Sequence, residues 1–131
     1  DGSSAMLSEC DEKFNAVVSD LARTPFDDSE FECVICSHVI RHNEPSNYKS
    51  LIDEMCRVSS KYVLIINPFV TDRKNVIRMF KTDIPDFPMV ISDLDRMMAE
   101  NDYATTHREH GLMSYNFAGT TEELMMYEVR Q

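Results

Sequence analysis

Two continuous apolar runs lie in the middle of the chain, FECVICS at residues 31–37 and KYVLIINPF at residues 61–69. Apolar residues fill successive positions in each run, so both faces of an extended segment would be apolar. Strands of this kind are typical of open α/β sheets that are covered on both faces. The pattern predicts two buried strands, of which the first is a central strand and the second ends at Pro68.

The segment between these strands, SNYKSLIDEMCRVSSK at residues 46–61, has the apolar spacing of a helix. Ser46 or Asn47 is expected to cap its N-terminus. Its apolar side chains form a single stripe, made by Tyr48, Leu51, Ile52, Met55 and Val58. A strand, a helix and a second strand form a βαβ unit, so the two strands are predicted to be parallel, with a right-handed crossover.

The N-terminal part carries shorter patterns. SSAMLSECDEK at residues 3–13 predicts a short helix, with Ser3 or Ser4 as its cap. FNAVVSDL at residues 14–21 is mostly apolar and predicts a further strand, which would end in Asp20. A polar loop would then lead into the strand at residues 31–37.

The C-terminal part predicts one helix and two strands. SDLDRMMAEND at residues 92–102 is the helix, with Ser92 as its expected cap. Its core-facing side chains are expected to be Leu94, Met97 and Met98. THREHGLMSYNF at residues 106–117 and TEELMMYEVRQ at residues 121–131 are predicted strands, with Gly119 in the turn between them. The short connection favours an antiparallel hairpin.

Composition narrows the class of protein. The chain has 131 residues, of which 43% are hydrophobic, enough for one domain with a core. A formal net charge of −10 does not favour nucleic acid as a partner. No apolar run is long enough for a membrane span, and the first residues do not resemble a secretory signal. Four cysteines suit reduced thiols rather than a disulfide framework, so a cytoplasmic location is expected.

The stretch at residues 31–43 contains Cys33, Cys36, His38 and His42 and raises the question of a metal site. In a strand, residues three apart point to opposite faces, so the two cysteines would not reach one metal ion. A redox pair would need a helix N-terminus, which this run does not supply. Both cysteines are therefore expected to be small core residues, and no metal is predicted.

Polar side chains follow both predicted strands. Ser37, His38 and His42 come after the first, and Asn67 and Pro68 end the second. In a parallel sheet, ligands bind just beyond the carboxyl ends of the strands. Histidine titrates near neutrality, which makes His42 a candidate general base. The alternative is structural: histidines that only form hydrogen bonds, and an Asn-Pro pair that only ends a strand.

Three segments, taken in order, resemble the class I S-adenosylmethionine-dependent methyltransferases. They are DGSSAML at residues 1–7, VVSDLARTPFDDSEFECVICSHVIRH at residues 17–42 and LIDEMCRVSSKYVLIINP at residues 51–68. Asp1 matches the acidic residue that ends the family's second strand, and Asp20 matches the polar end of a later strand. The resemblance covers nearly the whole chain and depends on the order and spacing of these segments.

The resemblance implies an α/β fold, the Rossmann-like three-layer methyltransferase fold, with a mostly parallel sheet and a C-terminal antiparallel hairpin. The family's glycine-rich GxGxG loop is absent, because the three glycines stand at positions 2, 111 and 119. Glycines allow close backbone approach to a cofactor, so its affinity is expected to be weakened. The whole chain, residues 1–131, is thus expected to be one incomplete domain, truncated at the N-terminus. Residues 69–91 would form a lid that recognises the substrate.

The resemblance also implies roles for individual residues. The cofactor would be S-adenosylmethionine, and the methyl acceptor a small molecule. The residues implied in cofactor binding are Asp1 at the ribose, Asp20 at the adenine amino group, Leu21 against the ring, and Ser37 and His38 in the crevice. The implied catalytic residues are His42 and His38, and the implied substrate contacts are Asn67, Pro68 and Phe69.

A truncated sheet would leave the strand at residues 31–37 with a bare apolar edge, which invites pairing. Residues 14–18 could slide in beside it, a second copy could complete the sheet as a homo-oligomer, or a partner chain could supply the missing half. Three functions remain open at this stage: a methyltransferase, a non-catalytic methyltransferase-like subunit that supports a partner, and a metal-binding module, which the strand geometry disfavours.

Overall fold

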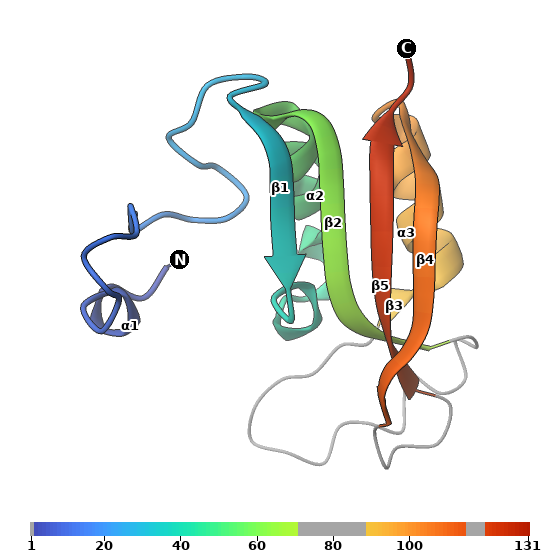
Figure 1. Cartoon of the computed structure of the whole chain (residues 1–131), viewed down its shortest axis with the longest axis horizontal. Helices are drawn as coiled ribbons and strands as arrows, with labels where there is room; N and C mark the ends of the chain where they lie inside the picture. The colour runs from blue at the N-terminus through green and yellow to red at the C-terminus, as the bar shows by residue number, and fades with distance from the viewer. Residues whose placement is uncertain (1, 71–88, 115–119) are drawn as a thin grey trace.

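A mixed β-sheet with two helices on one of its faces forms the body of the protein (Figure 1). The computed structural model describes residues 2–70, 89–114 and 120–131. Its elements are α1 (Ser4–Leu7), β1 (Phe31–Ser37), the 3₁₀ turns η1 (Ile40–His42) and η2 (Pro45–Asn47), α2 (Tyr48–Val58), β2 (Ser59–Val70), β3 (Met89–Val90), α3 (Ile91–Glu100), β4 (Tyr103–Ser114) and β5 (Thr120–Val129). The strand order is β1-β2-β5-β4, and β3 pairs with the end of β2.

The predicted βαβ unit is confirmed. β1 and β2 are parallel, with Val34 beside Val63 and Ser37 beside Ile66. Helix α2 connects the two strands, and its buried side chains include Leu51 and Ile52 of the predicted stripe. Asn47 occupies the N-cap position, but its side chain makes no capping hydrogen bond, because the turn η2 already leads the chain into the helix.

The predicted C-terminal hairpin is confirmed as well. β4 and β5 are antiparallel, with Tyr103 beside Val129 and His110 beside Glu123. The expected turn at Gly119 lies outside the described residues. β5 also pairs antiparallel with β2, so the sheet is mixed and the expectation of a mostly parallel sheet was wrong. A hairpin necessarily contributes an antiparallel pair, and here its second strand inserts beside β2.

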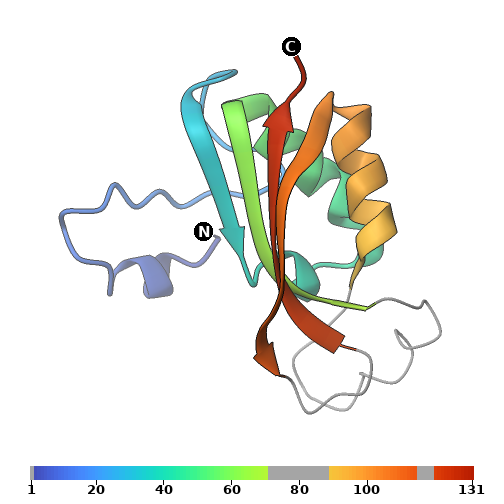
Figure 2. The same ribbon diagram turned by 45° about the vertical axis from the view of Figure 1, so that its right-hand side comes forward.

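Helices α2 and α3 cover the same face of the sheet (Figures 1 and 2). Between them and the strands lies the core, in which Ile52, Ile65, Leu94 and Met98 are each fully buried. The expected core residues of α3, Leu94, Met97 and Met98, are all buried. Two buried tyrosines form hydrogen bonds in this core. The Tyr127 hydroxyl joins the sheet to α3 by donating to Asp95 Oδ1 at 2.7 Å, and the Tyr103 hydroxyl of β4 donates to the Ser59 carbonyl at the start of β2, at 3.1 Å.

Two boundaries differ from the sequence prediction. β2 continues to Val70 instead of stopping at Pro68, because β5 pairs with it on both sides of the proline. α3 begins at Ile91 with Val90 as its N-cap, so Ser92 lies inside the first turn and is not the cap. Ser92 and Asp93 are residue types that suit either the N-cap or the first turn of a helix. The short strand β3 ends at Val90, and this sets the start of α3.

The predicted strand at residues 14–21 does not form. Only an isolated bridge between Asp20 and Arg23 occurs there, and Phe14 and Val18 are 62% and 58% exposed. Of the helix predicted at residues 3–13, only Ser4–Leu7 forms, as α1, and Ser3 caps it by accepting a hydrogen bond from the Met6 N–H. The run at residues 14–21 pairs with no strand of the described sheet, not even with the open edge of β1, so it gains no ladder hydrogen bonds and composition alone did not produce a strand.

β1 is an edge strand among the described residues, since β2 is its only partner there. Its burial is partial, and Ile35 is 63% exposed. The prediction of a central strand buried on both faces was therefore wrong, while the prediction of a bare apolar edge agrees with this geometry. One face of β1 has no helix over it in Figure 2.

A charged cluster fastens the loop before β1 to α2. Arg57 donates to both carboxylate oxygens of Glu54, to Asp28 Oδ1 at 2.6 Å and to the Phe26 carbonyl at 2.8 Å. Thr24 donates both its N–H and its hydroxyl to Glu54 Oε1, at 2.8 and 2.6 Å. These bonds, with that of Arg57 first, lower the pKa of Glu54 from 4.5 to about 2. The cluster fixes the loop that carries Leu21 toward the sheet.

We predict that Glu54→Gln destabilises the fold by about 2 kcal/mol at pH 7, because charge-assisted hydrogen bonds to a half-enclosed carboxylate are lost. The folded-state pKa is depressed, so the wild-type stabilisation is complete above pH 4.5 and is lost as pH falls toward about 2. Urea unfolding measured from pH 7 downward should show the difference between the two proteins narrowing in that window. The exposed Glu12→Gln is the control, and a pH-independent difference would contradict the assignment.

Candidate functional site

The carboxyl end of β1 carries the first group of predicted site residues. Ser37 is the last residue of the strand, and His38 follows it in the left-handed region, with φ 56°. The His38 N–H donates to the Ile66 carbonyl at 2.8 Å, which extends the pairing with β2 by one residue. A non-glycine residue in this region is strained by about 1 kcal/mol, and such residues cluster at functional sites.

The imidazole of His38 pairs with a carboxylate from the other end of the chain. Its Nε2 contacts Oε1 of Glu122, the third residue of β5. The His38 side chain is 37% exposed, whereas that of Glu122 is 5% exposed. Because β5 runs antiparallel to β2, its first residues lie at the carboxyl edge of β1 and β2. The topology thus brings a buried acid to a half-exposed histidine.

His42 lies farther along the same connection, at the end of η1. Its N–H donates to the Val39 carbonyl at 3.1 Å, and the Asn43 side chain donates to the same carbonyl at 2.9 Å. These bonds define a tight turn between β1 and α2.

Asp20 and Leu21 line a cavity of about 670 Å³, together with Gly2, Val18, Ser19, Asn43 and Leu51. Asn43 belongs to the connection after β1, and Leu51 to the first turns of α2, so this cavity lies toward the carboxyl edge of β1. Asp20 Oδ1 accepts a hydrogen bond from the Ala22 N–H at 2.9 Å, which is the local turn expected of a structural aspartate. A carboxylate can accept further hydrogen bonds, so this bond leaves it able to bind a ligand.

The predicted substrate residues Asn67, Pro68 and Phe69 lie in β2 and are all buried. Phe69 is 1% exposed and belongs to the hydrophobic core. The Asn67 side-chain nitrogen donates to the Pro68 carbonyl at 2.9 Å, and its buried Oδ1 has no hydrogen-bond partner among the described residues. An unsatisfied buried acceptor costs about 1–3 kcal/mol, so a ligand donor would be favourable there.

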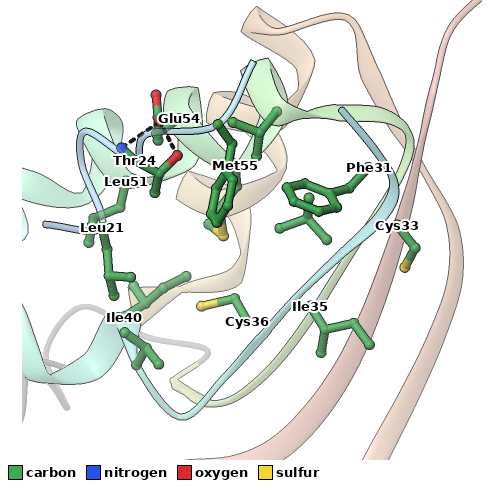
Figure 3. Close-up of a pocket in the computed structure, with 14 residues that line it drawn as sticks. Leu21, Thr24, Phe31, Cys33, Ile35, Cys36, Ile40, Leu51, Glu54 and Met55 are labelled. Atoms are coloured by element: carbon green, nitrogen blue, oxygen red, sulfur yellow. Dashed lines mark hydrogen bonds between the residues drawn. The ribbon is translucent and has the colours of Figure 1, made fainter. Parts of the chain in front are cut away.

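A second cavity, of about 320 Å³, opens beside β1 under the loop at residues 21–26 (Figure 3). Its walls are almost wholly apolar and include Ile35, Cys36, Ile40 and Met55. The charged residue in its lining, Glu54, is already engaged by Thr24, as the dashed lines show. This cavity suits apolar side chains better than a charged cofactor.

The two cysteines of the FECVIC run differ in environment. Cys33 is exposed and Cys36 is half-buried, so the expectation that both lie in the core was wrong for Cys33. Cys33 points to the face of β1 that no helix covers, opposite to Cys36. Among the described residues, no three or more His, Cys, Asp or Glu side chains gather as a metal site.

A family model described as "Methyltransferase domain" matches residues 1–66, half of the chain. The chain belongs to the methyltransferase family. The sequence resemblance to class I S-adenosylmethionine-dependent methyltransferases is thereby confirmed. No curated protein matches this methyltransferase chain.

Solved methyltransferases share its fold. A S-adenosylmethionine-dependent methyltransferase from Archaeoglobus fulgidus is 16% identical, with a TM-score of 0.75 over 98% of this chain and 73% of that one. An enzyme from Methanosarcina mazei is 13% identical, with a TM-score of 0.70 over 86% and 66%. The magnesium protoporphyrin IX methyltransferase of Synechocystis, with bound S-adenosylhomocysteine, is 13% identical, with a TM-score of 0.65 over 87% and 50%. This chain therefore spans half to two thirds of the length of the last two.

The described part of the chain brings together only some of the predicted site residues. Asp20 and Leu21 share one cavity, while Ser37 and His38 lie at the strand end outside that cavity's lining. Asp1 and most of the expected lid at residues 69–91 lie outside the described residues. No helix of the described part is long and apolar enough to cross a membrane.

Glu122 was missed by the sequence analysis. Glu122 lies near the start of β5, and because β5 is antiparallel to β2 this position is at the carboxyl edge of the sheet. The predicted hairpin fixed the direction of β5 relative to β4 but left open which strand β5 would join.

We predict that Cys10 and Cys33 react fast with Ellman's reagent in the native protein, whereas Cys36 and Cys56 react slowly. Burial raises the pKa of Cys36 to about 11 and that of Cys56 to about 12, which removes the reactive thiolate at neutral pH. Thiol titration at pH 7.5 with and without denaturant measures this, and all four thiols should react in denaturant. Equal native rates for Cys33 and Cys36 would contradict the structure.

Proposed function

We propose that this chain carries part of the cofactor and acceptor site of a S-adenosylmethionine-dependent methyltransferase acting on a small molecule. The observation that carries the proposal is the cavity beside Asp20 and Leu21, which lies at the same edge of the sheet as Ser37 and His38. Ligands of open α/β sheets bind at this edge. Family membership supports the reaction class, and the position of the cavity supports the proposed location of the site.

The residues of the cavity fit an adenosyl group. Asp20 offers a carboxylate to an amino or hydroxyl donor, and Leu21 and Leu51 offer apolar surface to a ring. In this proposal, Asp1 would contact the ribose hydroxyls, and Ser37 and His38 would line the path toward the reactive group. When bound, S-adenosylmethionine supplies an electrophilic methyl group, and the protein's main task is to align the nucleophile.

The acceptor would lie between the ends of β1 and β2. His38 and His42 are the proposed catalytic residues, since both follow β1 and histidine can exchange a proton near neutral pH. Asn67 is the proposed acceptor contact with the firmest support, because its buried Oδ1 has no partner in the described part of the chain. Pro68 and Phe69 are buried beside it and would shape the site from below.

We predict that the chain binds S-adenosylhomocysteine with micromolar affinity in a calorimetric titration. Asp20→Ala should weaken binding about tenfold, equivalent to about 1.4 kcal/mol, because one ligand hydrogen bond is lost. Asp11→Ala is the control, since Asp11 is an exposed acid of the same N-terminal segment that lies outside the cavity. Lack of binding at millimolar ligand, or equal affinity of the Asp20 variant, would refute the assignment.

A second candidate function is a non-catalytic methyltransferase-like subunit that pairs with another chain. The observation favouring it is the unpaired edge of β1 in the described part of the molecule, where Ile35 is 63% exposed above an apolar cavity. One structural neighbour, from Haloferax volcanii, is a putative methyltransferase in complex with the Trm112 methyltransferase activator. We propose that a second copy, or a partner strand, completes this sheet.

For this second candidate we predict self-association in sedimentation equilibrium, with β1 at the interface. Ile35→Lys should abolish the dimer without lowering stability, because the side chain is already exposed in the single chain. Phe14→Lys is the matched control, since Phe14 is 62% exposed and belongs to the N-terminal segment, which forms no strand of the described sheet. If the chain is monomeric at every concentration, the proposal that a second copy completes the sheet is refuted.

A further inference from the structure

We infer that Glu122 is a positioning residue that presents His38 as a proton acceptor at the carboxyl edge of the sheet. The inference rests on the function proposed above and deepens it. It starts from the contact of His38 Nε2 with Glu122 Oε1 and from the burial of that carboxylate, whose side chain is 5% exposed. A buried carboxylate is costly unless it accepts hydrogen bonds, so it selects a ring that donates to it.

The contact decides which ring nitrogen carries the proton. A neutral imidazole has one N–H donor and one acceptor nitrogen, and Glu122 is acceptor-only when ionised. Nε2 must therefore carry the hydrogen, which leaves Nδ1 with its lone pair. No described residue forms a hydrogen bond with Nδ1, and the His38 side chain is 37% exposed. Nδ1 can thus accept a proton from a ligand, while Nε2 is bound to Glu122.

The backbone supports the same orientation. His38 has φ 56°, and its N–H is tied to the Ile66 carbonyl at 2.8 Å. The strained residue is therefore held from both ends, by the β2 ladder at its backbone and by β5 at its ring. A carboxylate that orients a histidine and favours its imidazolium form is the arrangement by which enzymes activate a weak nucleophile.

This arrangement points to a class of acceptor. A base is useful only if the nucleophile carries a proton that must leave, as a hydroxyl or amine group does, and not for a carboxylate that is already ionised. The acceptor atom would lose its proton to Nδ1 as it bonds to the methyl carbon, while the electron pair of the broken carbon–sulfur bond stays on sulfur. Charge and atoms then balance, with His38 protonated and the sulfonium neutralised.

The other histidine pair makes a matched comparison. His110 Nδ1 contacts Glu123 Oε1 at 2.6 Å, and Glu123 is 1% exposed. Glu122 and Glu123 are adjacent in β5, so they point to opposite faces of the sheet. His110 is paired through Nδ1 on β4, whereas His38 is paired through Nε2 at the end of β1. The two pairs therefore predict different protonated nitrogens in one protein.

The test is a long-range ¹H–¹⁵N NMR experiment on the chain labelled with ¹⁵N-histidine, assigned with His38→Gln and His110→Gln. We expect a ring N–H signal of His38 on Nε2, protected from solvent exchange, and its loss in Glu122→Gln. Glu123→Gln should leave the His38 signal in place and change that of His110. A His38 proton on Nδ1 would overturn the inference, and the wild-type spectrum alone shows where this proton lies. A His38 signal that is unchanged in Glu122→Gln would also overturn it.

Methyl transfer to catechol, to a primary amine and to benzoate, followed as release of S-adenosylhomocysteine, tests the acceptor class. Glu122→Gln should lower kcat for the hydroxyl or amine probe at least tenfold, with unchanged affinity for S-adenosylhomocysteine. Methyl transfer to benzoate alone would overturn the inferred acceptor class. A kcat that is unchanged in Glu122→Gln would overturn the inferred role of Glu122. If the wild type does not bind S-adenosylhomocysteine but shows the expected His38 signal, the proposed function is refuted, whereas the pairing of His38 with Glu122 is still supported.

Discussion

The parallel pairing of β1 with β2 is the constraint on which the rest of the structure depends. Ser37 and Asn67 end up near the same edge because two parallel strands joined by α2 share their direction. β5 then pairs with β2 in the opposite direction, so its beginning reaches that edge. The meeting of His38 with Glu122 follows from these two pairings. Neither residue would approach the other in a sheet with a different strand order.

The cluster around Glu54 and Arg57 extends that constraint to the N-terminal segment. Residues 14–23 form no strand with the sheet, so hydrogen bonds to α2 hold the chain that follows them. Thr24 and Asp28 are the two ends of this attachment. The position of Leu21, and with it the wall of the larger cavity, therefore depends on a charge pair and not on β-pairing. We expect the shape of this cavity to be sensitive to acid, since the Glu54 carboxylate supports the loop that lines it.

The sequence alone predicted the elements whose patterns are long and local. The stripe of α2, the core side chains of α3 and the apolar runs of β1 and β2 all lie where periodicity placed them. Periodicity could not place elements whose state depends on distant partners. Residues 14–21 have a strand's composition but pair with no strand of the described sheet, and β1 has a central strand's composition but stands at the edge.

The candidate site shows the same division. His38 and Asp20 were found because they follow apolar runs and match a family pattern, both of which are local signals. Glu122 comes from β5, whose place beside β2 is a long-range fact that no window of sequence contains. Asn67 was found as a strand-ending residue, although β2 continues beyond it and the interest of its side chain is the unsatisfied oxygen. The positions of these residues at strand ends could be predicted from the sequence, whereas the hydrogen bonds that their side chains form could not.

The two candidate functions make the same demand on β1. The proposed methyltransferase site would need the end of this strand to be rigid, because Ser37 and His38 lie there. An edge strand with one partner is less well held than a central one. The exposed Ile35 and the apolar cavity beside it show that the packing which would hold β1 from its outer side is incomplete in the described part of the chain. An additional strand along that edge would therefore do more than cover apolar surface. It would fix the backbone that carries His38, so under the two proposals sheet completion and catalysis would be coupled through the same seven residues of β1.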